Sequence, residues 1–203
     1  SYTLSLHDAL PILEPELAVV TNLEPDHIEH HGGFEALRSS FDEFVEGVDG
    51  PVVLGIDDPE GAALAERSRL SGLDVCTVGT SDAADWMITE LRESWDGVRF
   101  VLQGPGTDVS VALPVPGLHN ARNAASAVVL ALLVGADPLA VADALGRFGG
   151  VARNVSVACA RAGGDVRLAS RGDDSVRADL RRAGVDVRSV EPGRASKYVA
   201  VLN

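Results

Sequence analysis

The stretch Ala18-Val19-Val20-Thr21-Asn22-Leu23-Glu24-Pro25-Asp26-His27 decides how the fold of this chain is interpreted. Its apolar half ends abruptly in polar residues, which is typical of a buried parallel strand that delivers side chains to the carboxyl edge of a sheet. Ligands of open α/β sheets bind at that edge. A histidine and carboxylates at a strand end can hold Mg²⁺ that bridges nucleotide phosphates. The alternative is that His27 is a structural group, which is the more common role of a lone histidine there.

Strand and helix patterns alternate along the chain from this stretch onward. The predicted elements are a strand at 17–21, a helix at 34–48, a strand at 51–55, a helix from 59 to about 70 and a strand at 75–78. Asp58 is a predicted N-cap, with Pro59 at the first helical position. Alternation of this kind implies right-handed crossovers and a parallel sheet.

The hydrophobic period changes after residue 85. Short alternating runs at 87–91, 98–102 and 109–113 are separated by Gly-containing turns, which predicts a small antiparallel sheet joined to the parallel one. Two helices then follow, at 120–134 and 138–148, and the first of them is rich in alanine. The tail repeats the α/β pattern, with predicted helices at 154–162 and 175–183 and predicted strands at 166–170, 185–190 and 198–202.

Composition narrows the class of protein. The 203 residues are 46% apolar, enough to bury a core in one or two domains, and no apolar run reaches the roughly 18 residues of a membrane-spanning helix. The net charge of −13 argues against a binder of nucleic-acid backbones. Cys76 and Cys159 are isolated, so we expect reduced thiols and a cytosolic setting.

Three motifs resemble those of the Mur ligases, the ATP-dependent amide ligases of peptidoglycan synthesis. Residues 21–32, TNLEPDHIEHHG, are similar to their TNxxxDHxxxxG segment, and residues 57–59 are similar to their DDP turn. Residues 117–127, GLHNARNAASA, resemble their segment built on HNxxN. The motifs occur in the family's order. The resemblance covers about residues 13–148 and implies the family's central ATP-binding domain, with a partial parallel sheet of the P-loop type.

The family resemblance implies a role for each matching polar residue. His27 would be a ligand of a catalytic Mg²⁺, supported by Asp26 and Asn22. Asn120 and Asn123 would lie on the adenine side of ATP, because an amide can both donate to and accept from a base edge. His119 would fix the entry of the Ala-rich helix close to the nucleotide.

Within the family, the chain most resembles the branch that adds L-alanine. Sister enzymes carry a carbamate-modified lysine on the helix after the Asp-His pair, whereas residues 34–48 contain no lysine. The implied small-molecule substrates are ATP, UDP-N-acetylmuramate and L-alanine, used in the cytoplasm without nucleic acid or membrane. A ligase that recycles the muramyl tripeptide stays open as an alternative.

Both ends of the chain are interpreted separately. Residues 1–12, SYTLSLHDALPI, resemble a translated sequencing adapter, so we expect a non-native segment rather than a genuine short element. Residues 149–203 resemble part of a carbohydrate kinase related to ribokinase, and within that family they are most similar to pseudouridine kinase. Gly149, Gly150 and Asn154 of its GGxxxN pattern would then contact sugar hydroxyls. An ordinary α/β continuation is the alternative. We expect a chimera joined at about 149–153.

The Gly-rich phosphate loop with its lysine, the acidic motif that follows it and the amino-acid-binding domain of these ligases do not occur in the 203 residues. Without the strand that carries the phosphate loop, the sheet lacks a central partner, so we expect exposed edges and poor stability.

We therefore expect this chain alone to have no ligase activity, because the residues that grip the phosphates are not part of it. The measurement is phosphate release in the presence of ATP, Mg²⁺, UDP-N-acetylmuramate and L-alanine. Release above the rate without the muramyl substrate would contradict this expectation.

Overall fold

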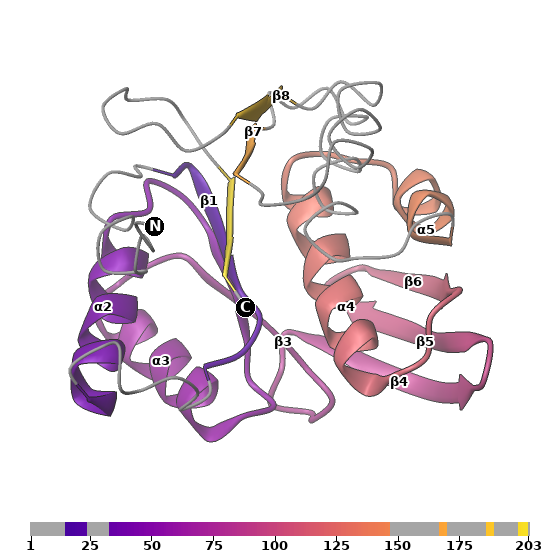
Figure 1. The fold of residues 1–203 in the computed structure, drawn as a ribbon, viewed down its shortest axis with the longest axis horizontal. Helices are drawn as coiled ribbons and strands as arrows, with labels where there is room; N and C mark the ends of the chain where they lie inside the picture. The colour runs from indigo at the N-terminus through magenta and orange to yellow at the C-terminus, as the bar shows by residue number, and fades with distance from the viewer. Residues whose placement is uncertain (1–14, 24–32, 147–166, 170–185, 189–198, 203) are drawn as a thin grey trace, which may run out of the picture.

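A computed structural model describes residues 15–23, 33–146, 167–169, 186–188 and 199–202 (Figure 1). The elements are β1 (Leu17–Val20), α2 (Phe34–Glu46), β2 (Val52–Gly55), α3 (Pro59–Leu70), β3 (Val75–Gly79), β4 (Trp86–Ser94), β5 (Gly97–Gly104), β6 (Thr107–Leu113), α4 (Leu118–Leu133), α5 (Pro138–Gly146), β7 (Arg167–Ala169), β8 (Asp186–Arg188) and β9 (Val199–Leu202).

One seven-stranded sheet organises these elements, in the order β6-β5-β4-β3-β2-β1-β9. The pairs from β9 to β4 are parallel, whereas β4, β5 and β6 pair antiparallel. The structure thus confirms the predicted α/β class, with a parallel sheet that continues into an antiparallel part. Strands β7 and β8 form a separate parallel pair.

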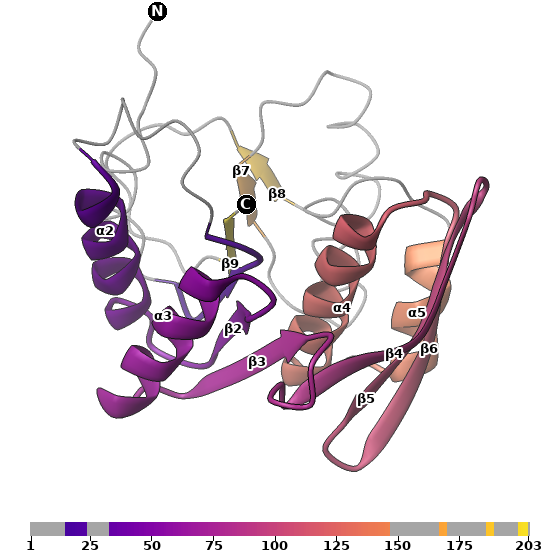
Figure 2. The same cartoon turned by 90° about the horizontal axis from the view of Figure 1, so that it is seen from below.

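Helices cover both faces of the parallel part (Figure 2). Val19 and Val53 belong to the hydrophobic core that includes the buried side chains of α4. Their neighbours Val20 and Leu54 belong to the core formed with α2 and α3. Side chains alternate across a strand, so β1 and β2 must be apolar at every position to serve both cores. This double burial explains the continuous apolar runs from which the strands were predicted.

Helix α4 packs along one face of the sheet and extends over its antiparallel part. Its buried residues are mainly alanine and valine, and Leu130 is fully buried among them. The facing residues of the antiparallel part include Val98, Phe100 and Leu102. Small side chains allow a helix to approach a sheet closely, which fits the alanine-rich sequence of this helix.

The outer side of β1 is not an exposed edge of the sheet. Strand β9 pairs in parallel with β1, with Leu17 opposite Val199 and Val20 opposite Leu202. The tail strand predicted at 198–202 therefore satisfies the backbone groups on the outer side of β1. The predicted strands at 166–170 and 185–190 correspond to the shorter β7 and β8. The helices predicted at 154–162 and 175–183 lie outside the described residues.

Helices α2 and α4 differ from their predicted bounds. Helix α2 ends at Glu46 instead of Val48, and the following residue is Gly47. Helix α4 begins at Leu118, two residues earlier than predicted, and ends at Leu133, one residue earlier. It starts directly after Gly117, which has a φ of 111°. Among the described residues, no helix is long and apolar enough to span a membrane.

Cys76 is a free, partly buried thiol on β3. Burial and then the nearby Asp85 carboxylate raise its pKa to about 11, because both disfavour the thiolate. The thiol is therefore protonated near neutral pH.

We expect Leu130→Ala to lower the free energy of unfolding by about 2–5 kcal/mol, because it removes a fully buried side chain and leaves a cavity. Leu133→Ala is a matched control on the same helix, where the leucine is 43% exposed, and it should cost much less. Urea unfolding followed by circular dichroism measures both. Equal costs would show that α4 does not pack as described.

Candidate functional site

The candidate site lies at the carboxyl edge of the parallel strands. Thr21 and Asn22 follow β1, Asp57 and Asp58 follow β2, and Thr80 follows β3. Parallel strands end on the same side, so the sheet brings these three polar segments to one edge. The Thr21 hydroxyl donates a hydrogen bond to Asn22 Oδ1 at 3.1 Å.

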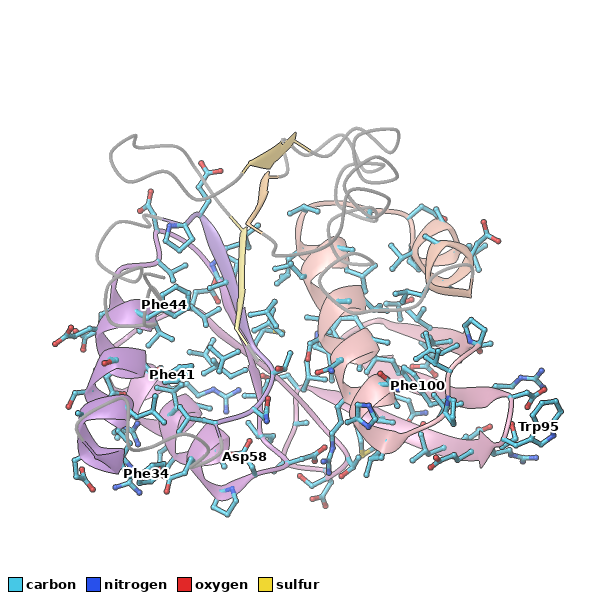
Figure 3. The ribbon with its side chains drawn as sticks, viewed as in Figure 1. Phe34, Phe41, Phe44, Asp58, Trp95 and Phe100 are labelled. Carbon is cyan, nitrogen blue, oxygen red and sulfur yellow. The ribbon has the colours of Figure 1, made fainter. Side chains whose placement is uncertain are left out.

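Asp58 is the N-cap of α3, as the sequence predicts. Its Oδ1 accepts a hydrogen bond from the Gly61 N–H at 2.7 Å, and Pro59 occupies the first turn. Its Oδ2 accepts from the Leu23 N–H at 3.4 Å. The same carboxylate therefore caps a helix and holds the segment that follows β1. Figure 3 labels Asp58.

Gly61 permits α3 to start close to the end of β2. A Cβ atom at this position would lie 2.2 Å from the carbonyl oxygen of Gly55. That distance is impossible for non-bonded atoms, so a side chain at Gly61 would push α3 away from the edge. The close approach of helix and strand keeps Asp58 within reach of Leu23.

Asp57 connects three segments of the edge. Its Oδ1 accepts hydrogen bonds from the Thr80 N–H at 2.7 Å and from the Thr80 hydroxyl at 2.8 Å. Its Oδ2 accepts from Arg122 Nε at 2.5 Å, and the Asp57 side chain is only 10% exposed. This ion pair brings the first turns of α4 to the carboxyl edge of β2 and β3.

The start of α4 depends on glycine and on a local amide contact. Gly117 has a φ of 111°, and no side chain caps the helix. The Asn120 amide donates to the carbonyl oxygen of Pro116 at 2.6 Å, which holds the preceding turn. The ring of His119 lies over Gly117, since a Cβ there would be 2.7 Å from His119 Cε1. His119 is exposed.

The structure describes only part of the predicted site. The described residues include Asn22, His119, Asn120 and Asn123. Asn123 is partly buried on α4, next to Arg122 in the sequence. The predicted metal residues His27 and Asp26 lie outside the described residues. So do the three residues of the predicted sugar site: Gly149, Gly150 and Asn154.

The donor set at the edge suits a nucleotide better than it suits a metal. Asp57 and Asp58 both use their carboxylates in protein contacts. No group of three or more metal-capable side chains occurs in the described part of the chain. The Mg²⁺ ligands predicted from the sequence, His27 and Asp26, lie outside the described residues. The uncapped start of α4 and its amide side chains are of a kind that can face a base or a sugar.

Sequence reasoning missed the role of Asp57. The sequence indicates an N-cap and a family motif at the Asp-Asp-Pro turn, and it indicates no role for Arg122. Nothing in the local pattern links the two residues, because they are 65 positions apart. The available signal was weak: an acidic residue just after a buried strand needs a partner if it is itself buried.

A family model described as the Mur ligase middle domain matches residues 1–131. The chain belongs to the Mur ligase family. The UDP-N-acetylmuramate–L-alanine ligase of Thermobifida fusca is 34% identical over 195 residues, covering 94% of this chain and 41% of the relative. The corresponding ligase of Kineococcus radiotolerans is 43% identical over 141 residues, covering 68% of this chain and 30% of the relative.

Solved Mur ligases share the fold. MurF from Acinetobacter baumannii superposes with a TM-score of 0.62 at 22% identity, covering 71% of this chain and 32% of that protein. MurF from Thermotoga maritima, solved in complex with ADP, gives 0.53 at 16% identity, covering 96% of this chain and 54% of that protein. The chain spans about 30–41% of the length of the two curated relatives.

The family comparisons extend into both end segments. The family match begins at residue 1 and so includes residues 1–12. The alignment with the Thermobifida ligase covers 94% of the chain and so reaches beyond residue 148. These comparisons do not show the ribokinase-like resemblance of residues 149–203. The segment boundaries at 12 and 148 stay predictions.

We expect Asp58→Ala to destabilise the domain by about 1 kcal/mol, because it removes the N-cap of α3. Asp58→Asn is the matched control, since asparagine keeps an oxygen that can accept from the Gly61 N–H. Chemical unfolding of both variants measures the difference. An alanine variant as stable as the asparagine variant would show that the cap does not stabilise the domain.

Proposed function

We propose that this chain supplies the nucleotide-binding middle domain of an ATP-dependent ligase that joins L-alanine to UDP-N-acetylmuramate. Membership of the Mur ligase family supports the reaction class, and two curated relatives carry that ligase name. The observation that carries the proposal is the contact between Arg122 and Asp57. It joins the HNxxN segment to the sheet edge where the segment containing Asn22 begins.

Asn120 and Asn123 are proposed to face the adenine, and His119 to hold the entry of α4 near the nucleotide. An amide side chain offers both a donor and an acceptor, which matches the edge of adenine. The ADP complex of the Thermotoga maritima MurF supports nucleotide binding by this fold. Asn22, at the end of β1, would line the opposite side of the nucleotide.

His27 is proposed to hold Mg²⁺, with Asp26 in support. When bound, the ion neutralises charge that develops on the transferring phosphoryl group. The muramyl carboxylate would take the γ-phosphoryl group of ATP to give an acyl phosphate. The amine of L-alanine would then attack the carbonyl carbon and displace phosphate. In this proposal the chain's own task is to hold the base of the nucleotide and the ion, so that both are positioned for the first step.

The branch assignment within the family rests on α2. The residues of α2 include no lysine that could carry a carbamate. The alternative is a ligase that attaches a recycled tripeptide through the same acyl phosphate. The two differ only in the amine that attacks, so a comparison of L-alanine with the tripeptide in the complete enzyme would separate them. ATP and UDP-linked substrates imply a cytoplasmic setting for either enzyme.

We expect Mg²⁺-dependent binding of ATP by the chain, measured by isothermal titration calorimetry. Asn123→Ala should weaken it about tenfold through a lost adenine contact, and His27→Ala should reduce its dependence on Mg²⁺. Gln103→Ala is the matched control, because this exposed amide lies on β5.

Two results would contradict the proposed function. The first is no binding of ATP by the unaltered chain at millimolar concentration. The second is an equal effect of Asn123→Ala and Gln103→Ala, which would show that the amide on α4 has no special place in the binding of the base.

A further inference from the structure

We propose that Asp57 is a positioning residue for the adenine side of the site. By binding Arg122 and Thr80 together, it would fix the first turns of α4 against the carboxyl ends of β2 and β3. The orientation of Asn120 and Asn123 would then depend on a carboxylate that has no place in the predicted ligand set. This inference rests on the proposed function for its ligand, but its geometry stands on the described contacts.

The geometry is that of a junction with two separate sides. Oδ1 of Asp57 receives both hydrogen bonds from Thr80, at 2.7 and 2.8 Å. Oδ2 receives the bond from Arg122 Nε at 2.5 Å. Hydrogen bonds between charged groups are shorter and stronger than neutral ones. With only 10% of the Asp57 side chain exposed, water competes little for them.

The first half of helix α4 needs such a directional contact because its buried side chains are small and specify its position weakly. They are Ala121, Ala124, Ala125, Ser126 and Ala127, and the larger Val128, Val129 and Leu130 follow only later in the helix. Small side chains give few interlocking shapes along the helix axis. A shift or rotation of the helix therefore loses less packing than it would with large side chains. An ion pair has one short geometry, so it can set the register of the helix.

Contacts local to the start of α4 cannot replace this junction. Asn120 binds Pro116 and the Ala121 N–H binds Gly117, but both partners belong to the turn that leads into the helix. They would move with the helix. Arg122 instead reaches across 65 residues to the β2–α3 turn. Among the polar contacts that the structure describes for the first two turns of α4, the Arg122–Asp57 contact is the one that connects the helix to the carboxyl edge of the sheet.

A second ion pair provides a matched control on the other face of the sheet. Arg67 of α3 donates to Asp42 of α2 through Nε at 3.1 Å and through Nη2 at 3.0 Å. Its side chain is 40% exposed, close to the 38% of Arg122. Both pairs connect separate elements, but the Arg67 pair does not touch α4.

The experiment compares Asp57→Asn, Arg122→Gln, Arg122→Lys and Arg67→Gln in the full 203-residue chain. Asp57→Asn keeps an oxygen for Thr80 but loses the charge that binds Arg122, and Arg122→Lys keeps the positive charge. Two kinds of measurement are made. The first gives the affinities for Mg²⁺-ATP and Mg²⁺-GTP, and the second gives the hydrogen-exchange rates of the backbone amides at 120–123. The ratio of the two affinities reports how well the base is positioned, which a loss of overall stability alone would not change.

We expect Asp57→Asn and Arg122→Gln to weaken ATP binding about tenfold and to reduce the preference for ATP over GTP. They should also accelerate exchange at 120–123 more than in the rest of α4. Arg122→Lys should retain most of the preference for ATP over GTP. Arg67→Gln should leave the nucleotide affinities and the exchange rates at 120–123 unchanged. If Asp57→Asn does not fold, the two Arg122 variants alone decide the question, because Arg122 is more exposed.

The outcomes separate this inference from the proposed function. Unchanged base preference in Asp57→Asn and Arg122→Gln, with ATP still bound, overturns the inference and leaves the proposed function. Equal effects in Arg67→Gln overturn it as well, since they would indicate general stability. If the unaltered chain binds no ATP, the proposed function and the adenine role fail. Local acceleration of exchange at 120–123 would then still support the positioning of α4, and unchanged exchange would overturn that too.

Discussion

Burial of β1 and β2 on both faces is the constraint on which the rest of the structure depends. Val19 and Val53 pack toward α4, whereas Val20 and Leu54 pack toward α2 and α3. A strand that must satisfy two cores cannot carry polar side chains along its length. Polar residues can occur only where the strand ends. The same burial that stabilises the sheet therefore concentrates the chemistry at its carboxyl edge.

The residues at that edge divide into those that build it and those available to a ligand. Asp57 and Asp58 belong to the first group, because each carboxylate accepts hydrogen bonds from two different segments. In the proposed function, Asn123 and the exposed His119 at the start of α4 belong to the second group. An acidic residue in a motif is easily assumed to bind metal, but here two of them hold the framework. In the proposed function the metal role belongs to the Asp26-His27 pair, which lies outside the described residues.

The antiparallel part of the sheet has a different relation to the site. Strands β4, β5 and β6 contribute Ile88, Val98, Phe100 and Leu102 to the core beneath α4. These strands extend the apolar surface on which α4 packs, and this surface helps to hold the helix in place. The family membership agrees with this arrangement, since MurF from Acinetobacter baumannii shares the overall fold.

The sequence by itself determined the local elements and the family. Apolar periodicity located β1 to β6 and the four described helices to within a few residues, and the Asp58-Pro59 pair identified the start of α3. These signals are local, because a strand period, a cap or a turn depends on neighbouring residues. The order of the three motifs by itself indicated the Mur ligases.

Only the tertiary structure decided which distant segments meet. It paired β9 with β1, and it joined Arg122 to Asp57. Both contacts depend on how whole elements pack, and a single sequence carries no local trace of them. The opening stretch thus predicted where polar groups would emerge from the sheet. The fold determined that a buried carboxylate on the next strand would hold the helix opposite them.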